Sequence, residues 1–129
     1  MKNLEALLEE VLGRRPLRLR RIFTSDWAAV ERAEMPGGDI FAVKHPLAGA
    51  RSTTELEARM LRFLASNSEL PVPEVMAVTE DLLAMAFVES GGRLDAEAQR
   101  DAARHMAKLH DIPSETFGLS FDTLYGPAD

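Results

Sequence analysis

The hydrophobic positions in the first third of the chain change from helical to strand spacing. Apolar residues recur at intervals of three or four near the start, which predicts a helix with one apolar side made of Leu4, Leu7, Leu8, Val11 and Leu12. Asn3 can cap the start of this helix and Gly13 its end, and Pro16 stops any continuation.

Strand patterns follow. From Leu17 to Ile22 leucine alternates with arginine, which predicts a strand with one buried face. A second strand is expected from Ala28 to Ala33 and a third from Ile40 to Lys44. The residues Pro36 to Asp39 lie between the last two and are typical of a hairpin turn. We therefore expect a helix and then three antiparallel strands.

Helical spacing returns after Ser52-Thr53-Thr54, which can open a second helix. Its apolar residues share one face, with Leu61 beside them, and are Leu56, Met60, Phe63 and Leu64. Pro71-Val72-Pro73 ends this region. Two more strands are expected from Glu74 to Thr79 and from Leu82 to Val88, joined by Glu80-Asp81.

The end of the chain is predicted to hold one helix and a loop. Gly91-Gly92 interrupts the strand pattern, and Asp95 can cap a helix that runs to about His110. The apolar side of this helix is expected to contain Leu94, Ala98, Ala102, Met106 and Leu109. The tail from Pro113 to Asp129 is rich in glycine, proline, serine and threonine and is expected to be loop.

This order of elements predicts an α+β fold, a five-stranded antiparallel sheet with one packed helix. It matches the small lobe of the protein-kinase-like fold, and the helix after Gly91-Gly92 would be the first helix of the large lobe. We expect residues 1–90 to form the N-terminal lobe and residues 91–129 to be the start of a truncated C-terminal lobe.

Composition narrows the class of protein. The 129 residues are 46% hydrophobic and 28% charged, enough for one globular core. A net charge of −6 argues against nucleic acid as a partner, because binding it requires a basic surface. Without cysteine there is no disulfide framework and no thiolate metal site. No signal peptide and no membrane-length apolar run is present, so we expect a cytoplasmic location without membrane partners.

Phe41-Ala42-Val43-Lys44 is the stretch with the clearest chemistry, read with Glu57 on the helix that follows. Kinases use a strand lysine to hold the phosphates of ATP and a helix carboxylate to hold the lysine. Two alternatives stay open. Glu57 stands at capping-box spacing from Thr54 and could simply cap the helix, and Glu55 could be the partner of Lys44 instead.

Several segments together resemble the fructosamine (ketosamine) kinase family, relatives of the aminoglycoside phosphotransferases. They are Leu12-Gly13, Phe41 to Lys44, Glu57 with Leu61 and Leu64, Val72 to Val75, Leu82 to Met85, Ala107 to His110, Phe117 to Leu119, and Asp122 to Pro127. The last two, which together make up the stretch from Phe117 to Pro127, favour this family over other kinase-like phosphotransferases. The resemblance implies ATP-dependent phosphorylation of a sugar hydroxyl on a glycated amine, or of another small-molecule acceptor, with magnesium.

The resemblance also assigns a nucleotide site. Lys44 would grip phosphate, Glu57 would orient Lys44, and the backbone of a hinge would hold adenine, with the hinge formed by Met85, Ala86, Phe87 and Val88. The loop from Phe23 to Ala28 would cover the phosphates but contains no glycine. In that loop Ser25 could hydrogen-bond phosphate or simply belong to a polar turn.

Two other groups of residues have less specific patterns. His105 and His110 are five apart and do not share a helix face, so a shared metal site is not expected. The basic cluster of Arg14, Arg15, Arg18, Arg20 and Arg21 is expected to be a solvated surface, though it could meet an anionic partner.

Catalytic residues are not found in this sequence. The two asparagines, Asn3 and Asn67, do not follow an aspartate at catalytic-loop spacing. We expect the N-terminal part of a longer kinase, inactive alone, with its magnesium ligands elsewhere and apolar surface that promotes self-association. The rival hypothesis is a non-catalytic kinase-like domain that binds a protein partner.

Overall fold

The computed structural model describes residues 3–89, 95–115, 118–119 and 121–122. In chain order the elements are α1 (Leu4–Leu12), β1 (Arg18–Thr24), β2 (Ala28–Glu34), β3 (Ile40–Pro46), α2 (Thr54–Asn67), β4 (Val75–Val78), β5 (Leu83–Ala86) and α3 (Ala96–His110). The predicted α+β fold is confirmed. The expected lobe boundary at residues 90–91 lies outside the described residues, as do Phe117 and residues 123–129 of the tail motif.

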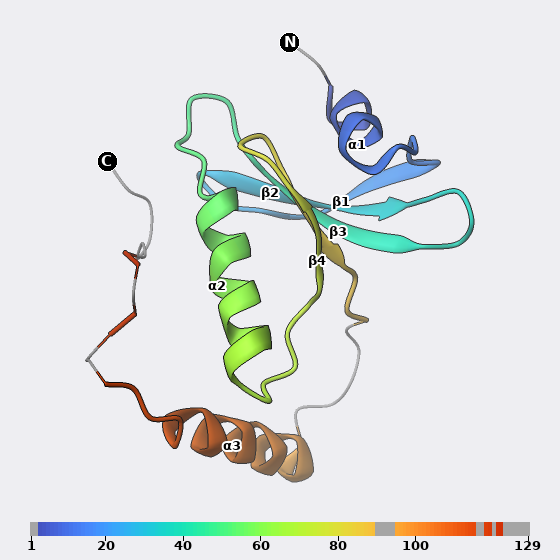
Figure 1. Ribbon diagram of the computed structural model, residues 1–129. Coiled ribbons are helices and arrows are strands. Elements are labelled where there is room, and N and C mark those ends of the chain that lie inside the picture. The colour runs from blue at the N-terminus through green and yellow to red at the C-terminus, as the bar shows by residue number, and fades with distance from the viewer. Residues whose placement is uncertain (1–2, 90–94, 116–117, 120, 123–129) are drawn as a thin grey trace.

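The described strands form one sheet in the order β1-β2-β3-β5-β4, and every neighbouring pair is antiparallel. The predicted antiparallel sheet is therefore confirmed. The order also shows that β5 lies between β3 and β4, so the chain crosses from β3 through α2 to the sheet edge before returning (Figure 1). This arrangement brings the end of β5 beside the start of β3.

Local chemistry explains the first helix and the hairpin that follows β2. The Asn3 side chain accepts a hydrogen bond from the backbone N–H of Ala6, and Gly13 ends α1 in the left-handed conformation, with φ of 73°. In the β2–β3 turn, Gly37 and Gly38 have φ of 96° and 99°. Few other residues adopt such angles without strain, so the glycines permit the tight turn that the sequence predicts.

Helix α1 covers one face of the sheet. Leu8 is fully buried and packs in a cluster with alternate residues of the strands and of the positions next to their ends, which are Ala33, Met35, Phe41, Val43, Leu82 and Ala84. The apolar face of α1 completes this cluster with partly buried side chains. A second helix therefore packs on the sheet, in addition to the one that the sequence analysis expected.

Helix α2 packs against the opposite face. Successive side chains of a strand point to opposite faces, so Lys44 projects away from the α1 cluster that contains Val43. On that side Lys44 meets Glu57 of α2. The start of α2 is fixed by the buried Thr54, whose hydroxyl donates to the Thr79 carbonyl at 2.5 Å. This bond ties the helix to the β4–β5 turn.

The predicted buried face of the first strand is wrong. Leu17 lies before β1 with 74% of its surface exposed, and Leu19 is the one residue of β1 that is even half-buried. The reason is position, because β1 is an edge strand. Two arginines of the predicted basic cluster form ion pairs. Arg14 pairs with Asp39 at 3.0 Å and Arg15 pairs with Glu9 at 3.1 Å.

Helix α3 lies beyond the C-terminal end of α2 (Figure 1) and has no buried residue. Of its expected apolar side, Ala98 and Leu109 are half-buried and Ala102 and Met106 are exposed. Leu94 lies outside the described residues. The predicted helix is thus confirmed, but its apolar side has little to pack against.

Two contacts connect the chain beyond β5 to the α2 region. Lys108 forms an ion pair at 3.0 Å with Glu69, and this hydrogen bond and charge lower the pKa of the Glu69 carboxyl. The Phe121 ring packs edge-on against the Phe63 ring, with 6.1 Å between the two ring centroids. The Arg59 guanidinium lies over the Phe121 ring, 4.2 Å from the centroid of that ring.

No helix in the described part of the chain is long and apolar enough to cross a membrane.

Candidate nucleotide site

The Lys44 ammonium and the Glu57 carboxylate form an ion pair, as the spacing of strand and helix predicts. Their side chains are 24% and 31% exposed, so the pair is partly shielded from water. Two consecutive elements, β3 and α2, each supply one member of the pair. The contact therefore shows that the start of α2 packs close to β3.

The capping alternative for Glu57 is wrong. Helix α2 begins at Thr54 with Thr53 at the cap position, so Thr54 is already inside the first turn. The Glu57 carboxylate instead accepts hydrogen bonds from Lys44 and from the Thr53 hydroxyl, the latter at 3.3 Å. Glu55 is exposed, and it is Glu57 that pairs with Lys44.

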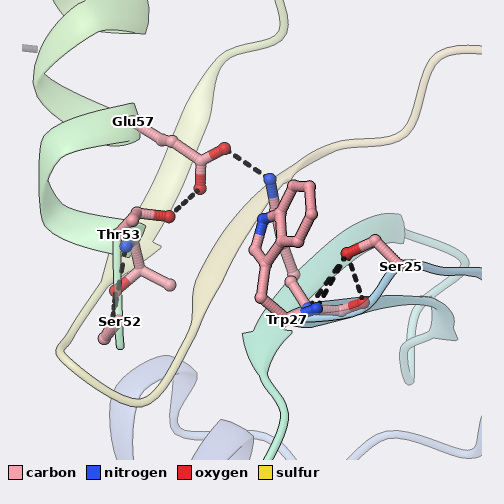
Figure 2. A network of polar contacts seen from close by, with 8 residues as sticks. Ser25, Trp27, Ser52, Thr53 and Glu57 are labelled. Carbon is pink, nitrogen blue, oxygen red and sulfur yellow. Dashed lines mark hydrogen bonds and ion pairs between the residues drawn. The ribbon is translucent and has the colours of Figure 1, made fainter. Parts of the chain in front are cut away.

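Trp27 is the residue of this site that the sequence analysis did not single out. Trp27, Lys44 and Glu57 all border one small cavity of about 10 Å³, and Figure 2 labels Trp27 and Glu57. Such a volume holds about one water-sized atom. The other residues around the cavity are Ala28, His45, Pro46, Arg51, Thr53 and Thr54. The lack of glycine in the β1–β2 loop was the available signal, because a bulky residue there must occupy space near Lys44.

Ser25 lies in the same loop but has a different role from the one the phosphate hypothesis gives it. Its hydroxyl accepts hydrogen bonds from the backbone N–H groups of Trp27 and Ala28, at 3.3 and 3.1 Å (Figure 2). It does not border the cavity. These contacts favour the polar-turn interpretation, in which Ser25 closes the turn that presents Trp27.

Of the four residues expected to form the hinge, Met85 and Ala86 end β5, and Phe87 and Val88 follow it. Met85 pairs with Ala42 and Ala86 with Phe41 in the β3–β5 ladder, and the Phe87 N–H donates to the Ile40 carbonyl at 3.3 Å. Val88 is 64% exposed. The pairing places this segment beside β3, the strand that carries Lys44.

A second charged cluster occupies the other side of the sheet. Glu31 is 7% exposed and its carboxylate pairs with Arg21 and with His45, whose Nε2 lies 3.1 Å away. Glu31 and Val43 are ladder partners and so share a face, opposite to that of Lys44. Glu31 and Arg21 therefore lie apart from the Lys44 cavity, and His45 is the member of the cluster that also borders it. The sequence offered no sign that this glutamate would be buried.

The histidines of α3 do not come together. His105 lies 3.7 Å from Asp101 within the helix, and His110 is exposed at the helix end. Among the described residues no group of three histidine, aspartate or glutamate side chains is arranged to hold a metal ion.

Comparison with known proteins gives two matches of different kinds. Residues 20–129 match the family model described as fructosamine kinase. The fold matches the crystal structure of a protein from Thermobifida fusca YX-ER1 that is provisionally assigned as a fructosamine-3-kinase, with a TM-score of 0.81 and 26% sequence identity. A search of curated proteins found no match.

The extent of the structural match differs between the two chains. It covers 98% of this chain but 44% of the Thermobifida protein. The shared region is thus nearly all of the present sequence and less than half of the solved one.

Proposed function

Because the chain belongs to the fructosamine kinase family, we propose that it is the nucleotide-binding part of a phosphotransferase that uses ATP. The proposed acceptor is a sugar hydroxyl on a glycated amine, and another small molecule is the nearest alternative. The observation that carries this proposal is the Lys44–Glu57 ion pair at a cavity between β3 and α2. A lysine held in this way is a fixed cation, which suits polyphosphate.

The residues present fit such a ligand. In the proposed complex the Lys44 ammonium contacts phosphate oxygens and the Glu57 carboxylate keeps Lys44 extended toward them. Val30, Ala42 and Met85 project from the same face of the sheet as Lys44, as their ladder positions require. They offer a small, apolar surface of the kind that binds flat ring systems, here adenine. The exposed backbone near Val88 is the proposed partner for its polar edge.

ATP itself supplies the phosphoryl group, and magnesium would neutralise its developing charge. No Asp–Asn pair at catalytic-loop spacing occurs in the 129 residues. We therefore place the catalytic aspartate and the magnesium ligands outside this sequence, and we propose that the chain alone binds nucleotide without transferring phosphate.

Calorimetric titration of the 129-residue chain with ATP tests the proposal. We expect measurable binding, and a loss of at least about tenfold in affinity for Lys44→Ala, since the ammonium provides a charge-assisted contact. Arg62→Ala is the matched control, because Arg62 is an exposed cation of α2 that does not border the cavity. A folded chain that binds no ATP would instead support the non-catalytic interaction module.

A second assay addresses catalysis. Incubation of the chain with radiolabelled ATP and a glycated lysine should leave the acceptor unlabelled. Labelled acceptor, formed by the wild-type chain and lost in Lys44→Ala, would overturn the proposal that the chain is inactive alone.

A further inference from the structure

The small cavity beside Lys44 is bordered by a second cation that the kinase pattern does not assign, Arg51. Arg51 lies in the connection between β3 and α2, three residues before the helix begins. Lys44 is neutralised by Glu57, whereas no ion pair joins Arg51 to a carboxylate among the described residues. Arg51 is exposed and also borders a neighbouring hollow with Glu55 and Glu80, but it forms no ion pair with them, so its charge remains available at the cavity edge.

The backbone around Arg51 is fixed by contacts on both sides. On the helix side, the Ser52 hydroxyl donates to the Glu80 carbonyl at 2.5 Å. On the strand side, the Ala50 N–H donates to the Leu47 carbonyl at 3.0 Å. The Leu47 N–H in turn donates to the Trp27 carbonyl at 2.9 Å. The β3–α2 connection and the Trp27 loop are thus tied together, which keeps Arg51 and Trp27 at the same cavity.

Two neutral donors complete the surroundings. The Thr53 hydroxyl donates to Oε2 of Glu57, the carboxylate oxygen that does not accept from Lys44. The Trp27 indole N–H makes no hydrogen bond with the described residues, and Trp27 borders the cavity, so this N–H offers a second donor. An anion at the cavity mouth would meet donors from Lys44, Arg51 and Trp27. The volume of about 10 Å³ admits one oxygen atom and not a whole phosphate.

We propose that Arg51 is a second phosphate-binding cation, which holds the same polyphosphate as Lys44 with one oxygen seated in this cavity. The inference rests on the proposed nucleotide site. It assigns to Arg51 and the Trp27 indole the contacts that a glycine-rich loop would make through its backbone. The guanidinium suits this task because its planar fork binds phosphate through two N–H groups.

The test compares ATP, inorganic tripolyphosphate and adenosine as ligands of the 129-residue chain. Arg51→Ala should weaken binding of ATP and of tripolyphosphate by roughly fivefold to twentyfold, as expected for one partly solvated charged contact. Adenosine affinity should not change. Arg51→Lys should restore part of the loss, and Arg62→Ala should resemble the wild type in all three titrations. Circular dichroism and thermal unfolding of each variant establish that it is folded.

Trp27 provides a local signal, because it is the only tryptophan in the sequence. Tripolyphosphate should change its fluorescence in the wild type and to a smaller extent in Arg51→Ala.

The outcomes separate the two proposals. If Lys44→Ala weakens ATP binding but Arg51→Ala binds ATP and tripolyphosphate as the wild type does, the Arg51 assignment is wrong and the nucleotide site stands. If Arg51→Ala weakens adenosine as much as ATP, the effect is structural and the assignment again fails. If the folded wild type binds neither ATP nor tripolyphosphate, both proposals fail.

Discussion

The Lys44–Glu57 pair should hold α2 against the sheet even without nucleotide, and a double-mutant cycle can measure this. The changes are Lys44→Met and Glu57→Gln, which remove the charges and keep the approximate length of each side chain. The quantity of interest is the difference between the destabilisation of the double variant and the sum of the two single effects.

The structure bounds the size of this coupling. Two unit charges about 4 Å apart interact by about 4 kcal/mol at the effective dielectric constant of a protein surface region. Fully exposed pairs retain only about 0.2–1 kcal/mol, because water and side-chain entropy oppose them. The side chains here are 24% and 31% exposed, between the two limits. We expect a coupling of about 1–2 kcal/mol.

Urea unfolding of the chain and its three variants is the assay, with the free energy extrapolated to water. The coupling should fall when salt is raised to about 1 M, where the screening length is about 3 Å. Lys108→Met with Glu69→Gln is the control cycle, because these side chains are 62% and 74% exposed. We expect the control coupling to be the smaller of the two.

The reasoning would be refuted by a Lys44–Glu57 coupling below about 0.3 kcal/mol, within the scatter of independent sites. The helix would then be positioned by its packing and by Thr54 alone.

Four further predictions follow from the same contacts. Leu8→Ala should lower the free energy of unfolding by about 3 kcal/mol, since Leu8 is fully buried, whereas Leu17→Ala at its exposed position should change little; equal effects in urea unfolding would contradict the packing of α1 on the sheet. Thr54→Val should cost about 1–3 kcal/mol, because the partly buried Thr79 carbonyl loses its donor; an unchanged unfolding midpoint would argue against that bond. Lys108→Met should raise the pKa of Glu69 toward its ordinary value of 4.5, measured by carboxyl NMR. A carboxyl whose pKa is lower in the folded state stabilises the fold above its unfolded pKa, and this stability is lost as pH falls through the folded pKa. The Lys108→Met variant should therefore be less stable than the wild type at neutral pH, and the difference should disappear in acid. Finally, the chain should self-associate through the poorly covered region around α3, and sedimentation showing only monomer at high concentration would refute this.

Much of the fold was predictable because its determinants are local. A cap residue acts on the turn next to it, and a glycine with positive φ acts at its own position, so Asn3 and Gly13 bound the first helix correctly. The period of the apolar residues then separates helices from strands. The Lys44–Glu57 contact was predictable through the resemblance to kinases, and the structure confirms the contact itself.

Tertiary structure alone decided which surfaces are covered. The alternation at Leu17 predicts a buried face, but β1 lies at the sheet edge and its apolar side chains, apart from the half-buried Leu19, stay exposed. Nothing in the sequence around Glu31 indicates burial, yet its side chain is buried and forms ion pairs with Arg21 and His45. Burial depends on which segments pack together across long separations in sequence, and no local pattern encodes that.

The same distinction applies to the candidate site. The sequence by itself determined that a lysine lies on a strand and a glutamate lies in the first turn of the next helix, although β3 continues past Lys44 to Pro46. Only the folded chain showed that Ser25 closes its own turn, that Thr54 binds the β4–β5 turn, and that Trp27 and Arg51 share a cavity with Lys44. Those contacts join residues from three connections of the sheet, whose distances from one another are set by strand order and helix packing.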